Sequence, residues 1–340
     1  MKVDAALYEF SAAGEEARRL EASGYAGAFT FEGPHDPFFP LVQAAQSTER
    51  IELYTAVAIA FARTPMLLAH IGWDLQALSR GRFLLGLGSQ IRPHIEKRFG
   101  MPWSRPAARM REMVQAVKEI WRVWREGGRL DFRGEFYQHT LMTPMFSPGK
   151  NPFGDPPIFL AGVGPAMTEV AGEVADGFFV HPLHSERSLR DVTIPALERG
   201  LAKACRPKDA LALSAQVMIA SGSSDEEIAS SRASTRQQIA FYGSTPAYRV
   251  VLAAHGWGDL QPELNERSKR GQWKEMAGLV TDEMLETFAI CCPLSDVAAQ
   301  VRARYGDVAQ RVSLVAHWAR DPEPWAEIAR ELSKAPSREA

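Results

Sequence analysis

The stretch IELYTAVAIAFARTPMLLAHIGWDLQALSRGRFLLG, residues 51–86, contains the pattern of a strand, a helix and a second strand. Residues 51–60 form a short apolar run, which predicts a buried strand. A helix begins near Pro65, where the missing N–H is harmless, and its apolar residues recur every three or four positions. Residues 82–86 (RFLLG) form a second run that is apolar after its first residue. Neither run alternates cleanly with polar residues, which is typical of parallel strands buried on both faces.

The same alternation continues outward in both directions. Short apolar runs predict eight strands, at residues 3–7, 28–31, 51–60, 82–86, 157–161, 177–180, 211–220 and 311–317. Helical patterns lie between or after them, at residues 12–23, 64–78, 106–126, 166–175 and 324–333. This alternation favours a (β/α)8 TIM barrel, and a doubly wound parallel sheet is the alternative.

The spacing between the predicted strands is uneven, so we expect insertions after the fourth and seventh strands. Residues 130–156, in the first insertion, are rich in Gly, Pro and aromatic residues. They predict a hairpin and a loop of the kind that covers an active site. We expect residues 1–333 to form a single domain and residues 334–340 to be a disordered tail.

Composition excludes several classes of protein. The 340 residues carry 39 Lys and Arg against 41 Asp and Glu, a net charge of −2, which argues against a protein that coats nucleic acid. The 3 Cys provide neither a disulfide framework nor zinc-ligand spacing, and no other motif indicates a metal site. No apolar segment follows a basic start, and the longest apolar run is about half a membrane span. We therefore expect a cytoplasmic protein without a membrane partner.

Catalytic groups in such a barrel lie at the C-terminal ends of the strands, so the candidate site residues are those that directly follow a predicted strand. Gly162, Val163, Gly164 and Pro165 follow the fifth strand directly and precede a helix. The glycines allow the backbone to approach a ligand, and a helix N-terminus offers free N–H groups and a positive dipole end to a phosphate. A plain tight turn is the alternative interpretation.

The turn after the fourth strand is a second candidate. Gly88 allows the close approach of a flat ligand, while Ser89 and Gln90 can form hydrogen bonds to it. A loop that needs a positive φ is the alternative. A basic stretch follows, in which Arg92 and Arg98 are the candidates to hold an anionic tail or phosphate beside the barrel mouth.

The loop after the second strand contains Glu32, His35 and Asp36. A carboxylate beside a His fixes its tautomer and tunes its pKa, so we assign His35 as the acid/base group and Glu32 or Asp36 as its orienting partner. Ordinary turn chemistry is the alternative. His181 and His317 end the sixth and eighth strands, and either can reach the pocket. A packed histidine with one hydrogen bond is the alternative for both, and it is favoured for His317.

Several longer segments have a familiar order: DLQALSRGRFLLGLG at 74–88, RFG at 98–100, FRGEFY at 132–137 and AGEVADG at 171–177. Together they resemble the luciferase-like superfamily of flavin- and deazaflavin-dependent oxidoreductases, over nearly the whole chain. The stretch SQIRPHIEKRFGMPW, residues 89–103, most resembles the branch that uses coenzyme F420.

The resemblance implies a (β/α)8 barrel with an insertion over the mouth, usually a homodimer. It implies that the cofactor phosphate lies in the turn at Gly162–Pro165 and that the flat ring lies over the ends of the early strands. The family often carries a non-prolyl cis peptide in the third strand, here near Ala56 and Val57, which supports the ring from behind. From its position at the end of the sixth strand, we also assign His181 as a cofactor-binding residue.

Two departures leave the substrate undefined. Relatives that oxidise sugar phosphates or alcohols carry an Asp–His pair after strand two, where this chain has the longer run from Glu32 to Asp36. Some carry Glu at the position of Ser89. The resemblance implies hydride transfer between the deazaflavin C5 and a carbon of a small organic substrate. An FMN-dependent monooxygenase and a non-catalytic flavin- or deazaflavin-binding protein are the alternatives.

Overall fold

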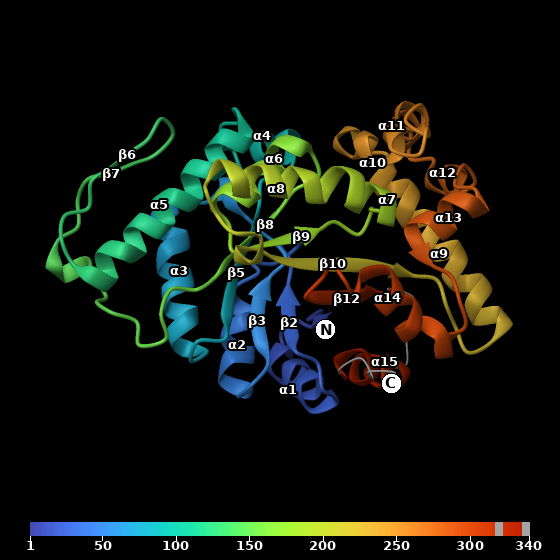
Figure 1. Ribbon diagram of the computed structural model, residues 1–340, viewed down its shortest axis with the longest axis horizontal. Coiled ribbons are helices and arrows are strands. Elements are labelled where there is room, and N and C mark those ends of the chain that lie inside the picture. Colours follow the sequence, from blue (N-terminus) through green and yellow to red (C-terminus); the bar gives the residue numbers. More distant parts are fainter. Residues whose placement is uncertain (317–321, 335–340) are drawn as a thin grey trace.

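The computed structural model describes residues 1–316 and 322–334, and its centre is a closed barrel of parallel strands (Figure 1). Eight strands pair side by side in chain order, and β12 pairs with both β10 and β1, which closes the ring. The barrel strands are β1 (Lys2–Ala6), β2 (Gly27–Thr30), β3 (Glu52–Thr55), β5 (Phe83–Gly88), β8 (Ile158–Ala161), β9 (Gly177–Val180), β10 (Ala212–Ile219) and β12 (Arg311–Val315). The predicted barrel is confirmed, and the doubly wound alternative is wrong.

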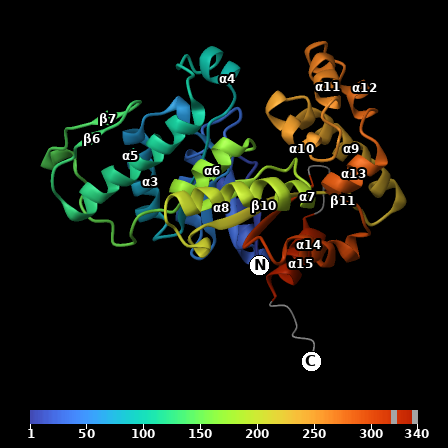
Figure 2. The same cartoon turned by 45° about the horizontal axis from the view of Figure 1, so that its top comes forward.

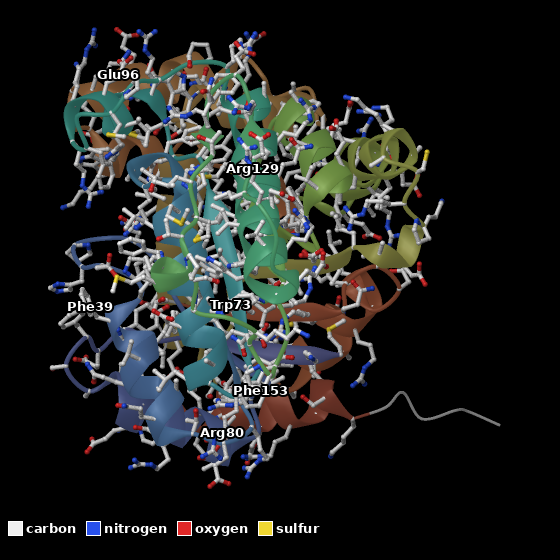
Figure 3. The ribbon with its side chains drawn as sticks, turned by 90° about the vertical axis from the view of Figure 1, so that its left-hand side faces the viewer. Phe39, Trp73, Arg80, Glu96, Arg129 and Phe153 are labelled. Atoms are coloured by element: carbon white, nitrogen blue, oxygen red, sulfur yellow. The ribbon has the colours of Figure 1, made fainter. Side chains whose placement is uncertain are left out.

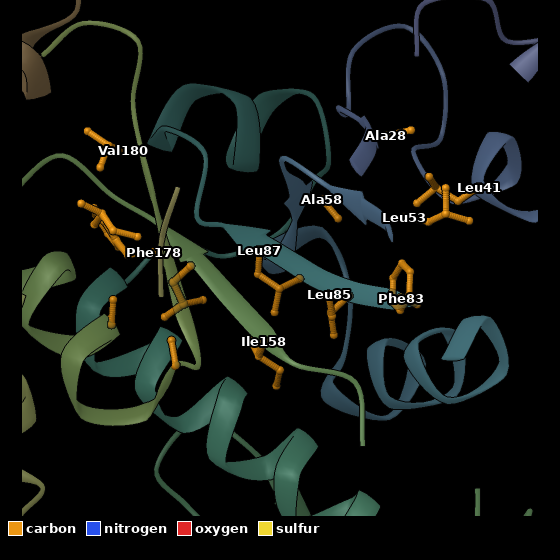
Figure 4. Packing of buried hydrophobic residues seen from close by; sticks show 14 of the residues in the cluster. Ala28, Leu41, Leu53, Ala58, Phe83, Leu85, Leu87, Ile158, Phe178 and Val180 are labelled. Carbon is orange, nitrogen blue, oxygen red and sulfur yellow. The ribbon is translucent and has the colours of Figure 1, made fainter. Parts of the chain in front are cut away.

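Helices surround the barrel and bury their apolar faces against it. They are α1 (Ala13–Ser23), α2 (Phe39–Ser47), α3 (Pro65–Leu78), α5 (Pro106–Glu126), α6 (Pro165–Val174), α8 (Ile194–Lys203), α14 (Val297–Tyr305) and α15 (Glu323–Ser333). The Thr64 hydroxyl caps α3 by accepting the N–H of Leu67 at 3.3 Å. Figure 4 shows Leu85, Leu87 and Ile158 pointing from β5 and β8 toward the helices beneath. None of the helices in the described residues is long and apolar enough to cross a membrane.

The insertion after the seventh strand forms a group of helices beside the barrel (Figure 2). It consists of α9 (Asp225–Gly243), α10 (Arg249–Ala253), α11 (Leu260–Lys269), α12 (Trp273–Ala277) and α13 (Asp282–Phe288). These helices bury a small apolar cluster of their own around Leu264 and Leu285. The strand β11 (Ala289–Ile290) then pairs with the C-terminal end of β10. Short α7 (Glu186–Ser188) links β9 to α8 through a π-helical turn.

The insertion after the fourth strand lies on the opposite flank. It begins with α4 (Arg92–Lys97), and β6 (Phe132–Arg133) and β7 (Gln138–His139) form the predicted hairpin. The carboxylate of Glu112 on α5 accepts the N–H groups of residues 135–137, which holds the hairpin along the outside of that helix. Residues 140–156 then cross this flank, where Figure 3 shows Trp73 and Phe153.

The position of residues 130–156 differs from the expected cover over the mouth. They connect the end of α5 to the start of β8, and such a connection returns to the N-terminal end of a barrel. Asn151 anchors the segment by donating its side-chain N–H to the carbonyl of Trp73 at 3.0 Å. Residue His317 of the predicted eighth strand and residues 335–340 of the predicted tail lie outside the described residues.

The third predicted strand is divided in two. β3 ends at Thr55 and β4 (Ala58–Ile59) continues alongside β5, with a cis peptide bond between Ala56 and Val57, where the family resemblance implied one.

The fourth predicted strand is longer than expected and contains both of its glycines. A Cβ on Gly86 would lie 1.6 Å from the carbonyl oxygen of Thr55, and one on Gly88 would lie 2.6 Å from a methyl carbon of Val57. The glycines therefore allow β5 to pack against β3 and the following turn. Gly88 therefore lies in β5 and not in the predicted turn, and its contact with a cofactor stays a prediction.

Candidate functional site

A cavity of about 290 Å³ opens at the C-terminal end of the barrel, the mouth. Its volume is at the lower end of the range for small-molecule sites. We call it the mouth cavity; it is lined by residues that include Ala6, Tyr8, Phe31, Ala56, His181, Gln216, Tyr242 and Ser313. They come from β1, β2, β10 and β12, from the segments after β1, β2, β3 and β9, and from α9. The mouth cavity therefore lies where a barrel enzyme binds its substrate.

The floor of the mouth cavity is aromatic and electrically balanced. Tyr54 stacks between Phe29 and Phe179, with ring centroids 5.3 and 5.5 Å away. Beneath them, the guanidinium of Arg311 donates two hydrogen bonds of 2.7 Å to the carboxylate of Asp4, and the Tyr54 hydroxyl donates a third at 2.8 Å. Three hydrogen bonds therefore already hold the Asp4 carboxylate. Burial of the Tyr54 hydroxyl, together with the nearby negative charge of Asp4, raises the pKa of Tyr54.

His181 is the titratable side chain best placed to contact a ligand. Its ring stacks on Tyr248 at 4.4 Å and meets Tyr242 edge-on at 4.5 Å. Burial, with a smaller contribution from His184, lowers the pKa of His181 to about 3, so the ring is neutral at physiological pH. The backbone N–H of Leu183 donates to Nδ1 at 3.1 Å, which leaves the proton on Nε2. His181 is therefore a neutral hydrogen-bond donor at the cavity wall.

The buried histidines make stability depend on pH. Burial also lowers the pKa of His184 to about 4. In the unfolded chain both rings take up a proton below about pH 6.5, whereas the folded chain keeps them neutral, so the free energy of unfolding falls as the pH falls through this range. We expect a loss of roughly 1 kcal/mol for each histidine between pH 7 and pH 5.5. Urea unfolding of the wild type and of His184→Gln measures it, and an unchanged slope in the variant would contradict the assignment.

The predicted pairing of His35 with a carboxylate is absent. Arg63 donates to Glu32 at 2.6 Å and to Asp36 at 2.8 Å, so one guanidinium binds both acids. Glu32 also accepts the N–H of Ile59 at 2.7 Å, which ties the loop to β4. The exposed ring of His35 stacks on Phe10 at 4.5 Å, beside a second hollow of about 100 Å³. The orienting role predicted for Glu32 and Asp36 is wrong, because Arg63 holds both.

Arg92 and Arg98, the two candidate residues of the basic stretch after β5, have different partners. Arg92 pairs with Glu96 at 3.0 Å in one turn of α4, on the exposed side. Arg98 donates to the carbonyl of Gly33 at 2.6 Å, which places it at the rim formed by the loop after β2. The Ser89 hydroxyl donates to the carbonyl of Gln90 at 3.1 Å, and the side-chain oxygen of Gln90 accepts the N–H of Ile91 at 3.0 Å. Only Arg98 of these residues is positioned by the fold at the edge of the mouth.

The glycine turn forms the N-terminus of α6, as predicted. Gly164 is the N-cap residue and makes no side-chain cap, and Pro165 is the first helical residue. A Cβ on Gly162 would lie 2.6 Å from Met167, whereas one on Gly164 would meet no atom within 4 Å. The turn therefore leaves open space directly in front of uncapped helix N–H groups, which is the arrangement that suits a phosphate.

A wider hollow of about 1120 Å³ lies away from the mouth, between α5, α6 and the hairpin. Ion pairs such as Lys118–Asp176 and Arg125–Asp155 line it. Because their charges are already paired and the hollow lies at the N-terminal ends of β8 and β9, away from the mouth, we do not assign it to catalysis.

Comparison with known proteins decides the family. The family model of the luciferase-like monooxygenases matches residues 3–311. The chain belongs to this family.

Related sequences align with this luciferase-like chain over most of its length. It is 53% identical to an uncharacterized protein of Mycobacterium tuberculosis over 92% of each chain. It is 30% identical to a 5,10-methylenetetrahydromethanopterin reductase of Archaeoglobus fulgidus, over 76% of this chain and 74% of the relative. The solved coenzyme F420-dependent tetrahydromethanopterin reductase of Methanopyrus kandleri has the same fold, with a TM-score of 0.78, 20% identity and coverage of 97% and 96%. The predicted oxidoreductase family is confirmed.

Several lining residues of this luciferase-like barrel were not among the predicted site residues. Tyr8 and Gln216 lie on or directly after strands, so the strand-end rule points to them. Tyr242 and Tyr248 come from the inserted helices, about sixty residues after His181. Nothing in their local pattern indicates that they return to the mouth, because their position depends on how the insertion packs.

Proposed function

We propose that this chain is a coenzyme F420-dependent oxidoreductase. The observation that carries the proposal is that the C-terminal end of one barrel offers both a neutral mouth cavity and an uncapped glycine turn at the start of α6. A flat ring with a phosphate side chain needs both features in one barrel. The names of the Archaeoglobus relative and of the Methanopyrus structure support a reductase that uses this cofactor.

The residues present fit such a cofactor. Gly162–Pro165 would hold the phosphate with backbone N–H groups, and His181 would donate a hydrogen bond from Nε2 to an acceptor on the ring. Ala56 and Val57 would lie behind the ring, and Arg98 would face its anionic tail. When bound, the deazaflavin supplies a carbon that accepts or donates a hydride. The chain's own contribution is to orient the ring and to exclude water.

His35 remains our proposed acid/base group, acting without a carboxylate partner. It lines the second hollow, and Tyr8 lines both that hollow and the mouth cavity. We expect His35→Ala to bind the deazaflavin as tightly as the wild type but to lose 100-fold or more in turnover, a typical contribution of a positioned proton donor. Stopped-flow absorbance with a reactive substrate measures it, and unchanged turnover would remove His35 from the mechanism.

A titration tests the proposed function. The apoprotein is titrated with the deazaflavin and with FMN at low and high salt, and quenching of its 8 Trp is followed. We expect tight binding of the deazaflavin that weakens with salt, since its tail is anionic. Preference for FMN would favour the monooxygenase alternative, with oxygen uptake as the next assay. Binding of neither would refute the proposal.

We also propose that the chain forms a homodimer through the flank formed by residues 130–156. Leu141, Met145 and Phe146 are largely exposed there, which is unusual for three large apolar side chains so close in sequence. Light scattering is expected to give about twice the 37.6 kDa of one chain. Replacing all three with Ser is expected to yield monomers, and a monomeric wild type would refute the proposal.

A further inference from the structure

We propose that the substrate is an uncharged molecule with a flat apolar or aromatic face, such as an aryl ketone or aryl alcohol. Phosphorylated and carboxylated compounds would be excluded. The inference rests on the proposed function, because it assigns the substrate class of the same mouth cavity. It is carried by the aromatic rim of this cavity and by the absence of free charge in its described lining.

The rim on the side of β1 and β2 is aromatic and exposed. Tyr8 is 60% exposed and Phe31 45% exposed, and their rings meet edge to face at 6.1 Å. Both residues line the mouth cavity. Exposed aromatic rings grouped at the entrance of a pocket usually mark a surface that an apolar partner covers.

The facing wall is aromatic as well. Tyr242 from α9 lines the mouth cavity, and the ring of His181 lies between Tyr242 and Tyr248. Tyr8 and Tyr242 line the same cavity, so the two aromatic walls face each other across it. A flat molecule entering here would contact aromatic rings on both sides.

Charge in the lining is balanced. Within residues 1–316 and 322–334, the cavity lining includes no Lys or Arg, and its only carboxylate is Asp4, which Arg311 neutralises. Among nearby cations, Arg63 binds Glu32 and Asp36, and Arg98, which hydrogen-bonds the carbonyl of Gly33, would already face the anionic tail of the cofactor. An anionic substrate would lose its hydrating water on entering the cavity and would find no cation in the lining to compensate, so its binding would be costly.

Neutral hydrogen-bonding groups are nevertheless available. Gln216 of β10 and Ser313 of β12 line the mouth cavity, and neither carries a charge. These groups can recognise one carbonyl or hydroxyl group without attracting a charge. The lining therefore fits a molecule with one polar atom on a largely apolar frame, the usual composition of a small-molecule pocket.

A binding competition tests the inference. Saturation-transfer NMR is recorded on the deazaflavin-loaded protein with 2-acetonaphthone, with glucose 6-phosphate and with both. We expect signal transfer to the ketone alone. Phe31→Ala and Tyr8→Ala are each expected to weaken ketone binding about fivefold, the worth of one aromatic contact. Phe39→Ala is the matched control, because Phe39 is an exposed aromatic on the outer flank (Figure 3) and is expected to change nothing.

Three results would overturn the inference. The first is transfer to glucose 6-phosphate in preference to the ketone. The second is ketone binding that Phe31→Ala and Tyr8→Ala leave unchanged. The third is ketone binding to the apoprotein that disappears on loading, which would mean that the cofactor alone fills the cavity. If the protein takes up no deazaflavin, the proposed function fails, and the same competition on the apoprotein then decides the inference by itself.

Discussion

Asp4→Ala is expected to lower the free energy of unfolding by about 3–5 kcal/mol, because it leaves the buried guanidinium of Arg311 without its main partner. Arg311 is 4% exposed and makes two hydrogen bonds to Asp4 inside the barrel. Glu52 also contacts Arg311 but is less buried, so it compensates only in part. Loss of the acceptor also leaves the buried hydroxyl of Tyr54 unpaired, which adds to the cost.

Urea unfolding followed by circular dichroism measures this loss. Lys2→Ala is the matched control, because the Lys2–Glu52 pair joins β1 to β3 nearer the surface and should contribute less than about 1 kcal/mol. The double variant Asp4→Leu with Arg311→Met removes both charges and is expected to recover most of the stability. A cost below about 1 kcal/mol for Asp4→Ala would show that the pair is not a determinant of the barrel.

Gly164→Asp is expected to weaken deazaflavin binding by at least about 100-fold. Two like charges about 4 Å apart repel by roughly 4 kcal/mol at the effective dielectric of a protein surface, which is more than enough for this loss. The fold should tolerate the side chain, because a Cβ at Gly164 meets no atom within 4 Å and its φ of −79° suits any residue. Asp is also a good N-cap, so α6 should be as stable as before or slightly more so.

Gly164→Asn is the control for this prediction. Asn has nearly the size of Asp and caps a helix equally well, but it carries no charge. Fluorescence titration should show a large loss for Asp and a small change for Asn, with both unfolding as the wild type does. Equal affinities for the two variants would mean that the phosphate is not held at this turn, whatever the cofactor is.

Most of the barrel could be predicted from local pattern. Runs such as 177–180 and 106–126 match the observed strand and helix, because periodicity and Gly or Pro punctuation are local properties. The apolar pattern of the third strand did not predict that it is divided into β3 and β4. Its single apolar run 51–60 contains no breaker, and the interruption after Thr55 appears only once β4 pairs with β5.

The candidate site was predictable only in part. The turn at Gly162–Pro165 and the position of His181 followed from the rule that strand ends meet at one face. The partner of Glu32 did not, because Arg63 lies 31 residues away and no local signal distinguishes it from the other cations. The same holds for Arg98, which looked free in the sequence but contacts Gly33 across 65 residues.

The sequence by itself determined the fold class, the insertions, the family resemblance and the helix N-terminus available to a phosphate, since each is encoded in a contiguous stretch. Only the tertiary structure decided the charge of the mouth. It paired Asp4 with Arg311, assigned Arg63 to two carboxylates, buried His181 among tyrosines and placed residues 130–156 on the flank. Charge and burial are properties of neighbours in space. Residues hundreds of positions apart become neighbours only when the barrel closes.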